Sequence, residues 1–262
     1  MARRFRCGDL SAQFDAITYQ KTIGSSNYNS LEIYLRHHSK SLEILAGYTF
    51  SKSLDDSSSL SEEVNPIDPG LSKALSAFDL RHNFVASYNY SVPGHMFGRE
   101  NRWTKGWSIS GVARLATGLP VTFYNNNDTS LLGSIPNGVN NNGLDTPDRV
   151  PGDLRINNNP RNGLPAFNTS LFSLPALGQF GTAARRFFSG PGMMNFDMAL
   201  QKNLPLTESK ALQFRVETFN TFNHAQFFGA TSVDGNISDA TFGQVVNSMP
   251  PRLVQVAMRF SF

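Results

Sequence analysis

The sequence predicts an all-β fold, specifically an antiparallel transmembrane β-barrel segment of about eight strands with long extracellular loops and short periplasmic turns. Two observations lead to this prediction. The strand-like runs alternate apolar and polar residues, and the connections between them sort by length. Because successive side chains of a strand point to opposite faces, such alternation separates an apolar face from a polar face.

The clearest alternation lies at the C-terminal end. The apolar row consists of Val254, Val256, Met258, Phe260 and Phe262, and the residues between them are Gln255, Ala257, Arg259 and Ser261. The run 211–217 behaves in the same way, with Leu212, Phe214 and Val216 opposed to Gln213, Arg215 and Glu217. Lipid outside and a wet lumen inside would satisfy both faces. We therefore expect the charged side chains of Arg114, Arg215, Glu217 and Arg259 to face the lumen.

Taken in order, the chain divides into an N-terminal segment, 1–27, and a barrel segment, 28–262. The first contains one weakly patterned strand at 13–22. In the second, alternation predicts strands at 28–38, 42–50, 83–92, 107–115, 196–200, 211–217 and 254–262. Leu31, Ile33 and Leu35, for example, alternate with Glu32, Tyr34 and Arg36.

The connections fall into two groups when they are counted back from the C-terminus. On the C-terminal side they are short or medium, at 39–41, 93–106 and 204–209. On the other side, apart from the short 23–27, they are long polar loops at 52–79, 119–192 and 223–251. Structureless loops of this length are uncommon in compact soluble domains, whereas outer-membrane barrels carry them on their exterior side.

Composition excludes several other classes. The net charge of +3 is scattered, so no nucleic-acid partner is expected, and the single Cys7 excludes an internal disulfide. No apolar run is long enough for a membrane-spanning helix. Residues 1–10 carry arginines without an apolar run behind them, which does not match a secretory signal; an exported protein would then have a different natural start.

No pattern for catalysis or metal binding is present. The five histidines lack ligand spacing, and the sequence has no Gly-x-Ser-x-Gly elbow, phosphate-binding loop or paired-carboxylate motif. We therefore expect neither an enzyme nor a cofactor. Residues 140–148 place a glycine among side-chain oxygens, as calcium loops do, but asparagines stand where a hard cation needs carboxylates, which favours a plain polar loop.

Five segments resemble the C-terminal barrel of TonB-dependent outer-membrane receptors, specifically the Oar-like group. They are GYTFSKSLDD at 47–56, FDLRHNF at 78–84, GWSISG at 106–111, RRFFSGPG at 185–192, and 214–224, which ends in FNTFNH. In that family a barrel of about 22 strands is plugged by an N-terminal domain, and TonB pulls on a box ahead of the plug. The resemblance therefore implies the C-terminal portion of such a transporter, located in the outer membrane of a Gram-negative-type bacterium.

The resemblance also implies partners. These are outer-membrane lipid, the remainder of the receptor barrel and its plug, and the barrel-insertion machinery, with TonB acting only through N-terminal regions that this chain lacks. A terminal strand that ends in Phe resembles the signal that the insertion machinery reads, so Val256, Met258, Phe260 and Phe262 form the expected assembly signal. The alternative interpretation is a soluble or surface-exposed β-sandwich that binds carbohydrate through its Asn-rich loops.

Overall fold

The computed structural model describes residues 22–262 except 61, 63, 132–143 and 157–158. The strand predicted at 13–22 lies, apart from Thr22, outside the described residues. In the part of the chain that the structure describes, no helix has the length and apolar character needed to cross a membrane.

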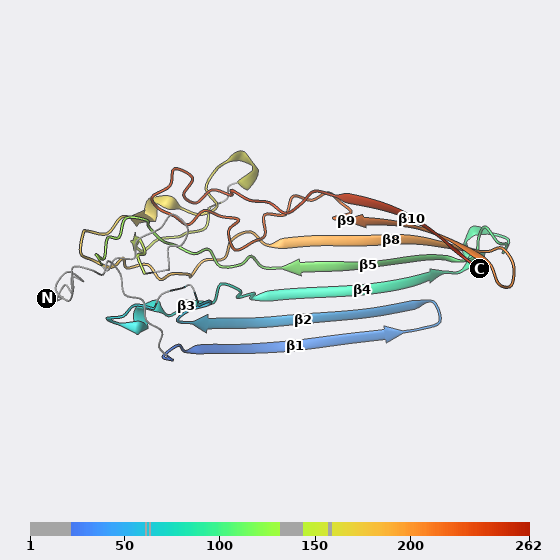
Figure 1. Ribbon diagram of the computed structural model, residues 1–262, viewed down its shortest axis with the longest axis horizontal. Helices are drawn as coiled ribbons and strands as arrows, with labels where there is room; N and C mark the ends of the chain where they lie inside the picture. Colours follow the sequence, from blue (N-terminus) through green and yellow to red (C-terminus); the bar gives the residue numbers. More distant parts are fainter. Residues whose placement is uncertain (1–21, 61, 63, 132–143, 157–158) are drawn as a thin grey trace.

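Among the described residues, seven long strands form one antiparallel sheet in which consecutive long strands lie side by side (Figure 1). They are β1 (Ser26–His38), β2 (Leu42–Asp55), β4 (His82–Val92), β5 (Trp107–Ala116), β8 (Met193–Pro205), β9 (Ala211–Phe219) and β10 (Leu253–Ser261). The short strand β3 (Ala74–Leu75) pairs with β2, and β6 (Asp148–Arg149) pairs with β7 (Phe172–Ser173). Short 3₁₀ turns lie at η2 (Pro69–Ser72), η3 (Gly94–Phe97), η4 (Pro160–Asn162) and η5 (Thr169–Leu171).

The strand register joins the alternating residues into continuous rows. Residues directly opposite one another on neighbouring strands share a face of the sheet. One row crosses from β10 to β2 through Val256, Val216, Leu200, Ile109, Tyr90 and Leu42. The adjacent row runs through Gln255, Glu217, Ala199, Ser110, Asn89, Glu43 and His38. The sheet therefore has one apolar face and one polar face, as the alternation predicts.

The apolar face is not covered by other described residues. Large side chains on it are exposed, including Leu200 at 43% and Val256 at 72%. An apolar surface that extends across a whole sheet is far larger than monomeric soluble proteins present to water, and marks contact with a partner or a membrane. A β-sandwich would bury this face under a second sheet, so the single layer argues against the soluble alternative.

The connections sort by side as predicted. The turns after β1, β4 and β8 lie with the C-terminus at one end of the sheet, and the long connections 56–81, 117–192 and 220–252 gather at the other end (Figure 1). We call the described residues of these three connections the loop body. Their common location explains how segments far apart in sequence come into contact.

The loop body has its own apolar core, which the sequence did not predict. Val121, Phe123, Leu154, Phe167 and Val233 are buried together. Phe123 stacks on Phe187 with 4.6 Å between ring centroids, and its edge-on contact with Phe167 is 5.1 Å. Residues 119–192 lack a regular apolar pattern because the apolar side chains that pack together come from different segments of the chain, not from one continuous strand or helix.

Backbone hydrogen bonds connect these segments. The Val121 N–H donates to the carbonyl of Phe188 at 2.8 Å, and the Phe123 N–H donates to that of Arg185 at 2.9 Å, so the beginning and end of the longest loop run side by side. The Tyr124 N–H donates to the carbonyl of Gly235 at 3.1 Å, which joins the last loop to the longest one, and the Leu75 N–H of the first loop donates to the carbonyl of Arg186 at 3.2 Å. The loop body is thus a folded unit rather than three separate loops.

Two strands extend further than the alternation predicts. β2 continues past Phe50 to Asp55, and its polar-face residues Ser51, Ser53 and Asp55 are buried. β8 runs over thirteen residues, well beyond the predicted 196–200. In both cases the added residues are more polar or irregular, and neighbouring strands and the loop body hold them in extended conformation.

Candidate functional site

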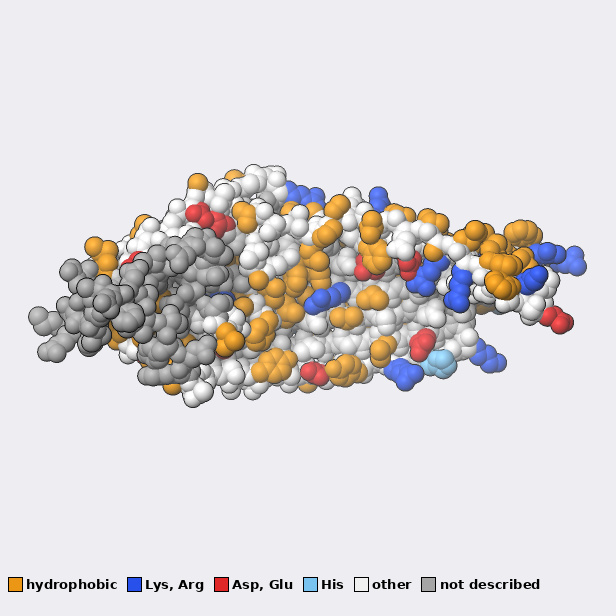
Figure 2. Space-filling view, in the orientation of Figure 1, with side chains coloured by type: hydrophobic (Ala, Val, Ile, Leu, Met, Phe, Trp, Pro, Cys, Tyr) orange, Lys and Arg blue, Asp and Glu red, His pale blue; other side chains and the backbone are white. Residues whose placement is uncertain are grey.

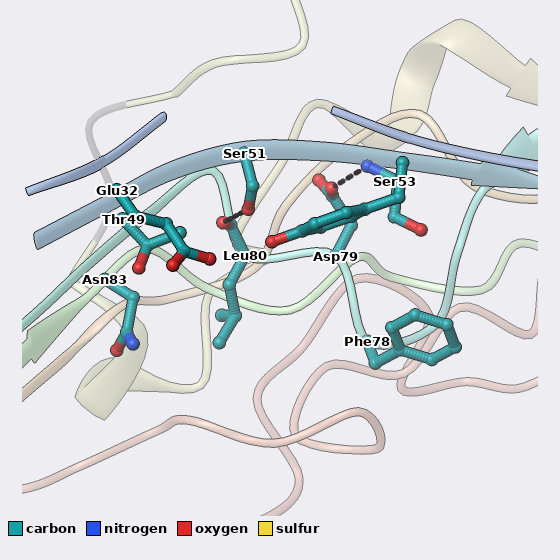
Figure 3. Close-up of a pocket in the computed structure, with 9 residues that line it drawn as sticks. Glu32, Thr49, Ser51, Ser53, Phe78, Asp79, Leu80 and Asn83 are labelled. Atoms are coloured by element: carbon teal, nitrogen blue, oxygen red, sulfur yellow. Dashed lines mark hydrogen bonds between the residues drawn. The ribbon is translucent and has the colours of Figure 1, made fainter. Parts of the chain in front are cut away.

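The polar face ends at a small hollow beneath the loop body, formed by β1, β2 and the residues before β4 (Figure 3). Its volume is about 300 Å³. It is lined by Tyr28, Glu32, Thr49, Ser51, Ser53, Phe78, Asp79, Leu80 and Asn83. Two contacts fix its floor: the Ser53 N–H donates to Asp79 Oδ1 at 2.6 Å, and the Ser51 hydroxyl donates to the Leu80 carbonyl at 2.8 Å.

The chemistry of this hollow suits a small polar solute. The Glu32 carboxylate, the Thr49 hydroxyl and the Asn83 amide supply acceptors and donors, while the rings of Tyr28 and Phe78 supply apolar surface. No sequence pattern predicted a site at these residues. The segment 78–84 resembles the receptor family, and β1 shows alternation, but neither feature indicates a binding site.

The four charged residues predicted to face the lumen all lie on the polar face. Arg215 Nη2 lies 2.5 Å from Glu217 Oε1, and Arg259 stands opposite Gln213 in the register. Arg114 donates from Nε to Asn83 Oδ1 at 3.2 Å. Figure 2 shows charged side chains of both signs over the strand region of the sheet. These groups hydrate the face and pair along it; a direct role in binding stays a prediction.

A second charged group lies inside the loop body and was not predicted. Arg185 Nη2 contacts Asp55 Oδ1 at 2.7 Å, and its Nη1 contacts Glu62 Oε2 at 2.6 Å. Arg186 also pairs with Glu62. The Arg185 side chain is only 1% exposed. The consecutive arginines 185 and 186 are visible in sequence, but their two carboxylate partners lie more than a hundred residues away.

Burial and pairing act in opposite directions on this cluster. Burial disfavours the ionised form of Glu62, but the hydrogen bond from Arg186, the backbone N–H of Ser58 and the charges of both arginines outweigh it, so the pKa of Glu62 is lowered. Burial also lowers the pKa of Arg185, with Glu62 and Asp55 opposing that shift. The cluster is therefore an ionised network that fastens the longest loop to the end of β2.

The predicted assembly signal occupies the open edge strand. Val256, Met258 and Phe260 share the apolar face, where Met258 stands opposite Phe214 and Phe260 opposite Leu212. The Phe260 and Phe262 rings are 5.9 Å apart, and Phe262 is 92% exposed. The placement provides a contiguous apolar strip at the terminus; its recognition by the insertion machinery stays a prediction.

Residues 140–143 of the calcium-like segment 140–148 lie outside the described residues. Its two carboxylates have protein partners. Asp145 Oδ1 accepts from the Ser130 N–H at 2.9 Å, and Asp148 Oδ1 accepts from the Thr182 N–H at 3.0 Å. Both contacts tie together parts of the loop body.

Comparison with known proteins places the chain in a family. The model of the family described as outer membrane beta barrel domain matches residues 2–255. The chain belongs to this family, and its location is the cell outer membrane. No curated protein matches the chain closely enough to name a relative. The two faces of the sheet and the sorted connections agree with this assignment.

Proposed function

We propose that the chain is the C-terminal portion of a TonB-dependent outer-membrane transporter, where it forms part of the wall of a plugged import channel. The observation that carries this proposal is the open sheet. Among the described strands, β1 pairs only with β2 and β10 only with β9, so each has an unpaired edge. In hydrocarbon every exposed backbone N–H or C=O costs several kcal/mol, about 4–8 by transfer to cyclohexane, so these edges require further strands.

Three further features support this proposal. The polar face carries the charges and hydroxyl groups of a wet lumen, the loop body and the hollow at Glu32 and Asp79 lie at its exterior end, and the segments 47–56, 78–84 and 185–192 resemble the receptor family. The role of the chain is then structural and noncatalytic. Its contribution to transport is to present a hydrated surface to the plug and the substrate.

The proposal is tested by reconstituting the purified chain in liposomes. Seven described strands would close, if at all, around an interior filled by side chains, because eight-stranded barrels leave no wide pore. We therefore expect no energy-coupled uptake and no large, stable single-channel conductance. Coexpression with the remaining strands and plug of a receptor of this type should restore a heat-modifiable barrel. A large stable conductance from the chain alone would contradict the proposal.

A further inference from the structure

A second, larger hollow lies where β2 and β5 end against the loop body. Its volume is about 1170 Å³. Six basic side chains line it: Lys52, Lys73, Arg81, Arg149, Arg155 and Arg186. Two carboxylates, Asp79 and Asp153, also line it. The hollow is therefore strongly basic, although the whole chain carries a net charge of only +3.

Five of these basic groups lack an acidic partner. Arg186 pairs with Glu62, but Lys52, Lys73, Arg81, Arg149 and Arg155 form no ion pair with a carboxylate of the described residues. Both carboxylates in the hollow already accept from backbone N–H groups, Asp79 from Ser53 and Asp153 from Arg155. The two carboxylates offset only part of the positive charge, so the hollow keeps an excess of cations within the described protein.

Arg149 gives a second and independent indication of a ligand. Its guanidinium lies over the Phe187 ring, 4.6 Å from the centroid, so the aromatic core of the loop body holds it in place. Its Nε is buried and has no hydrogen-bond partner among the described residues. A buried donor without a partner is costly, and Arg149 lines the hollow, so an anion that entered the hollow would meet this incompletely paired guanidinium.

The position of Lys52 places the hollow at the rim of the apolar face. Lys52 is exposed, whereas its neighbours Ser51 and Ser53 are buried on the polar side. Lys52 therefore shares a face with Phe50, which belongs to the apolar row. It lies two residues beyond Phe50, which is about 7 Å along a strand. A basic side chain of the hollow therefore lies on the apolar, lipid-facing side of β2, at the end of the strand next to the loop body.

We propose that this basic hollow binds a phosphate-bearing group, and that a lipid headgroup supplies it. Arginine and lysine are the side chains that recognise phosphate, the former through paired N–H donors and the latter as a point charge. An anionic headgroup would neutralise the unpaired cations and fill the site from the membrane side. The binding does not depend on transport, because it uses only the exterior end of the sheet and the loop body.

The test uses the full chain in a zwitterionic detergent, with its strand content verified by circular dichroism. Native mass spectrometry measures retention of phosphatidic acid and of phosphatidylcholine with the same acyl chains, and calorimetry measures binding of inorganic pyrophosphate. The unaltered chain should retain phosphatidic acid in preference to phosphatidylcholine. Lys52→Gln with Lys73→Gln should weaken that retention by about tenfold or more, since two exposed cations are removed.

The matched control is Lys40→Gln with Lys210→Gln, which removes the same charge from exposed turns at the opposite end of the sheet and should leave retention unchanged. Arg149→Gln gives a second, single-site variant that should also weaken retention. Pyrophosphate binding without preference for phosphatidic acid would support a phosphate site and exclude the lipid as its source. Absence of both, or equal loss in the control and test variants, would overturn the proposal.

Discussion

The sheet and the loop body of this protein are held together in different ways. In the sheet, the apolar side chains of β4, β5, β8 and β9 lie on an exposed face, and order comes from backbone pairing between neighbours in sequence. In the loop body, Phe123 and Phe167 are fully buried, and the contacts join segments from three separate connections. The apolar side chains of the strands are therefore stabilised by contact with lipid, whereas the loops are stabilised by an apolar core of their own.

The largest effect is expected from removing Arg185. Arg185→Met leaves the buried Asp55 carboxylate without its arginine and removes one of the two arginines that pair with Glu62, and breaking such a buried pair costs about 3–5 kcal/mol. Hydrogen exchange should show loss of protection in the described parts of 117–192, with the centres of β4 and β5 unchanged. Arg36→Met, which removes an exposed partner of Glu43, should have little effect. Equal protection in both variants would mean that the network does not hold the loop body.

A similar effect is expected from emptying the aromatic core. Phe167→Ala removes a fully buried ring that contacts several other phenylalanines, and should destabilise the loop body by about 3–5 kcal/mol. Limited proteolysis should then cleave the loop body while the strands resist. Phe222→Ala is the control, because Phe222 is 67% exposed. Cleavage at the same rate in both variants would argue against a separately folded loop body.

In the sheet, the two faces should respond differently to the same new charge. Val256→Arg places a cation on the apolar face near the centre of β10, which costs about 2–4 kcal/mol near the bilayer midplane. Gln255→Arg places it opposite Glu217 on the polar face, where it stays wet and gains a partner, so its effect should be mild. The measurement is the folded fraction in lipid vesicles across a urea titration. Equal damage from both would show that the faces do not separate lipid from water.

The smallest effect is a pH dependence confined to the loop body. The pKa of Glu62 is lowered in the folded protein, so its contribution to stability is complete above the ordinary value of 4.5 and is lost as the pH falls through the lowered value. Protection of the loop body should therefore decline with acidification below about pH 4.5, while the strands change less. Glu62→Gln should weaken the loop body at neutral pH and flatten this decline. An unchanged profile in the variant would assign the acid sensitivity to other carboxylates.

The sequence by itself determined the sheet. The alternation of apolar residues such as Val254, Val256 and Met258 can be recognised within one short segment. It depends only on the two faces of that strand contacting lipid and water, and not on which strands lie beside it. For the pairs β1–β2, β4–β5 and β8–β9, adjacent antiparallel pairing follows in turn from the short or medium connections between the strands. The extra length of β2 could not be predicted, because Ser51, Ser53 and Asp55 owe their burial to residues from distant loops.

Only the tertiary structure decided how the loops fold and where sites form. Arg185 pairs with Asp55 and Glu62, which lie more than a hundred residues earlier in the chain, and the pattern of residues within one segment cannot predict such a contact. Phe123, Phe167 and Val233 likewise lie in three stretches that each look polar and irregular alone. The hollow near Glu32 and Asp79 and the basic hollow near Lys52 and Arg149 also depend on those long-range contacts, because each is bounded by residues from segments that only the folded chain brings together.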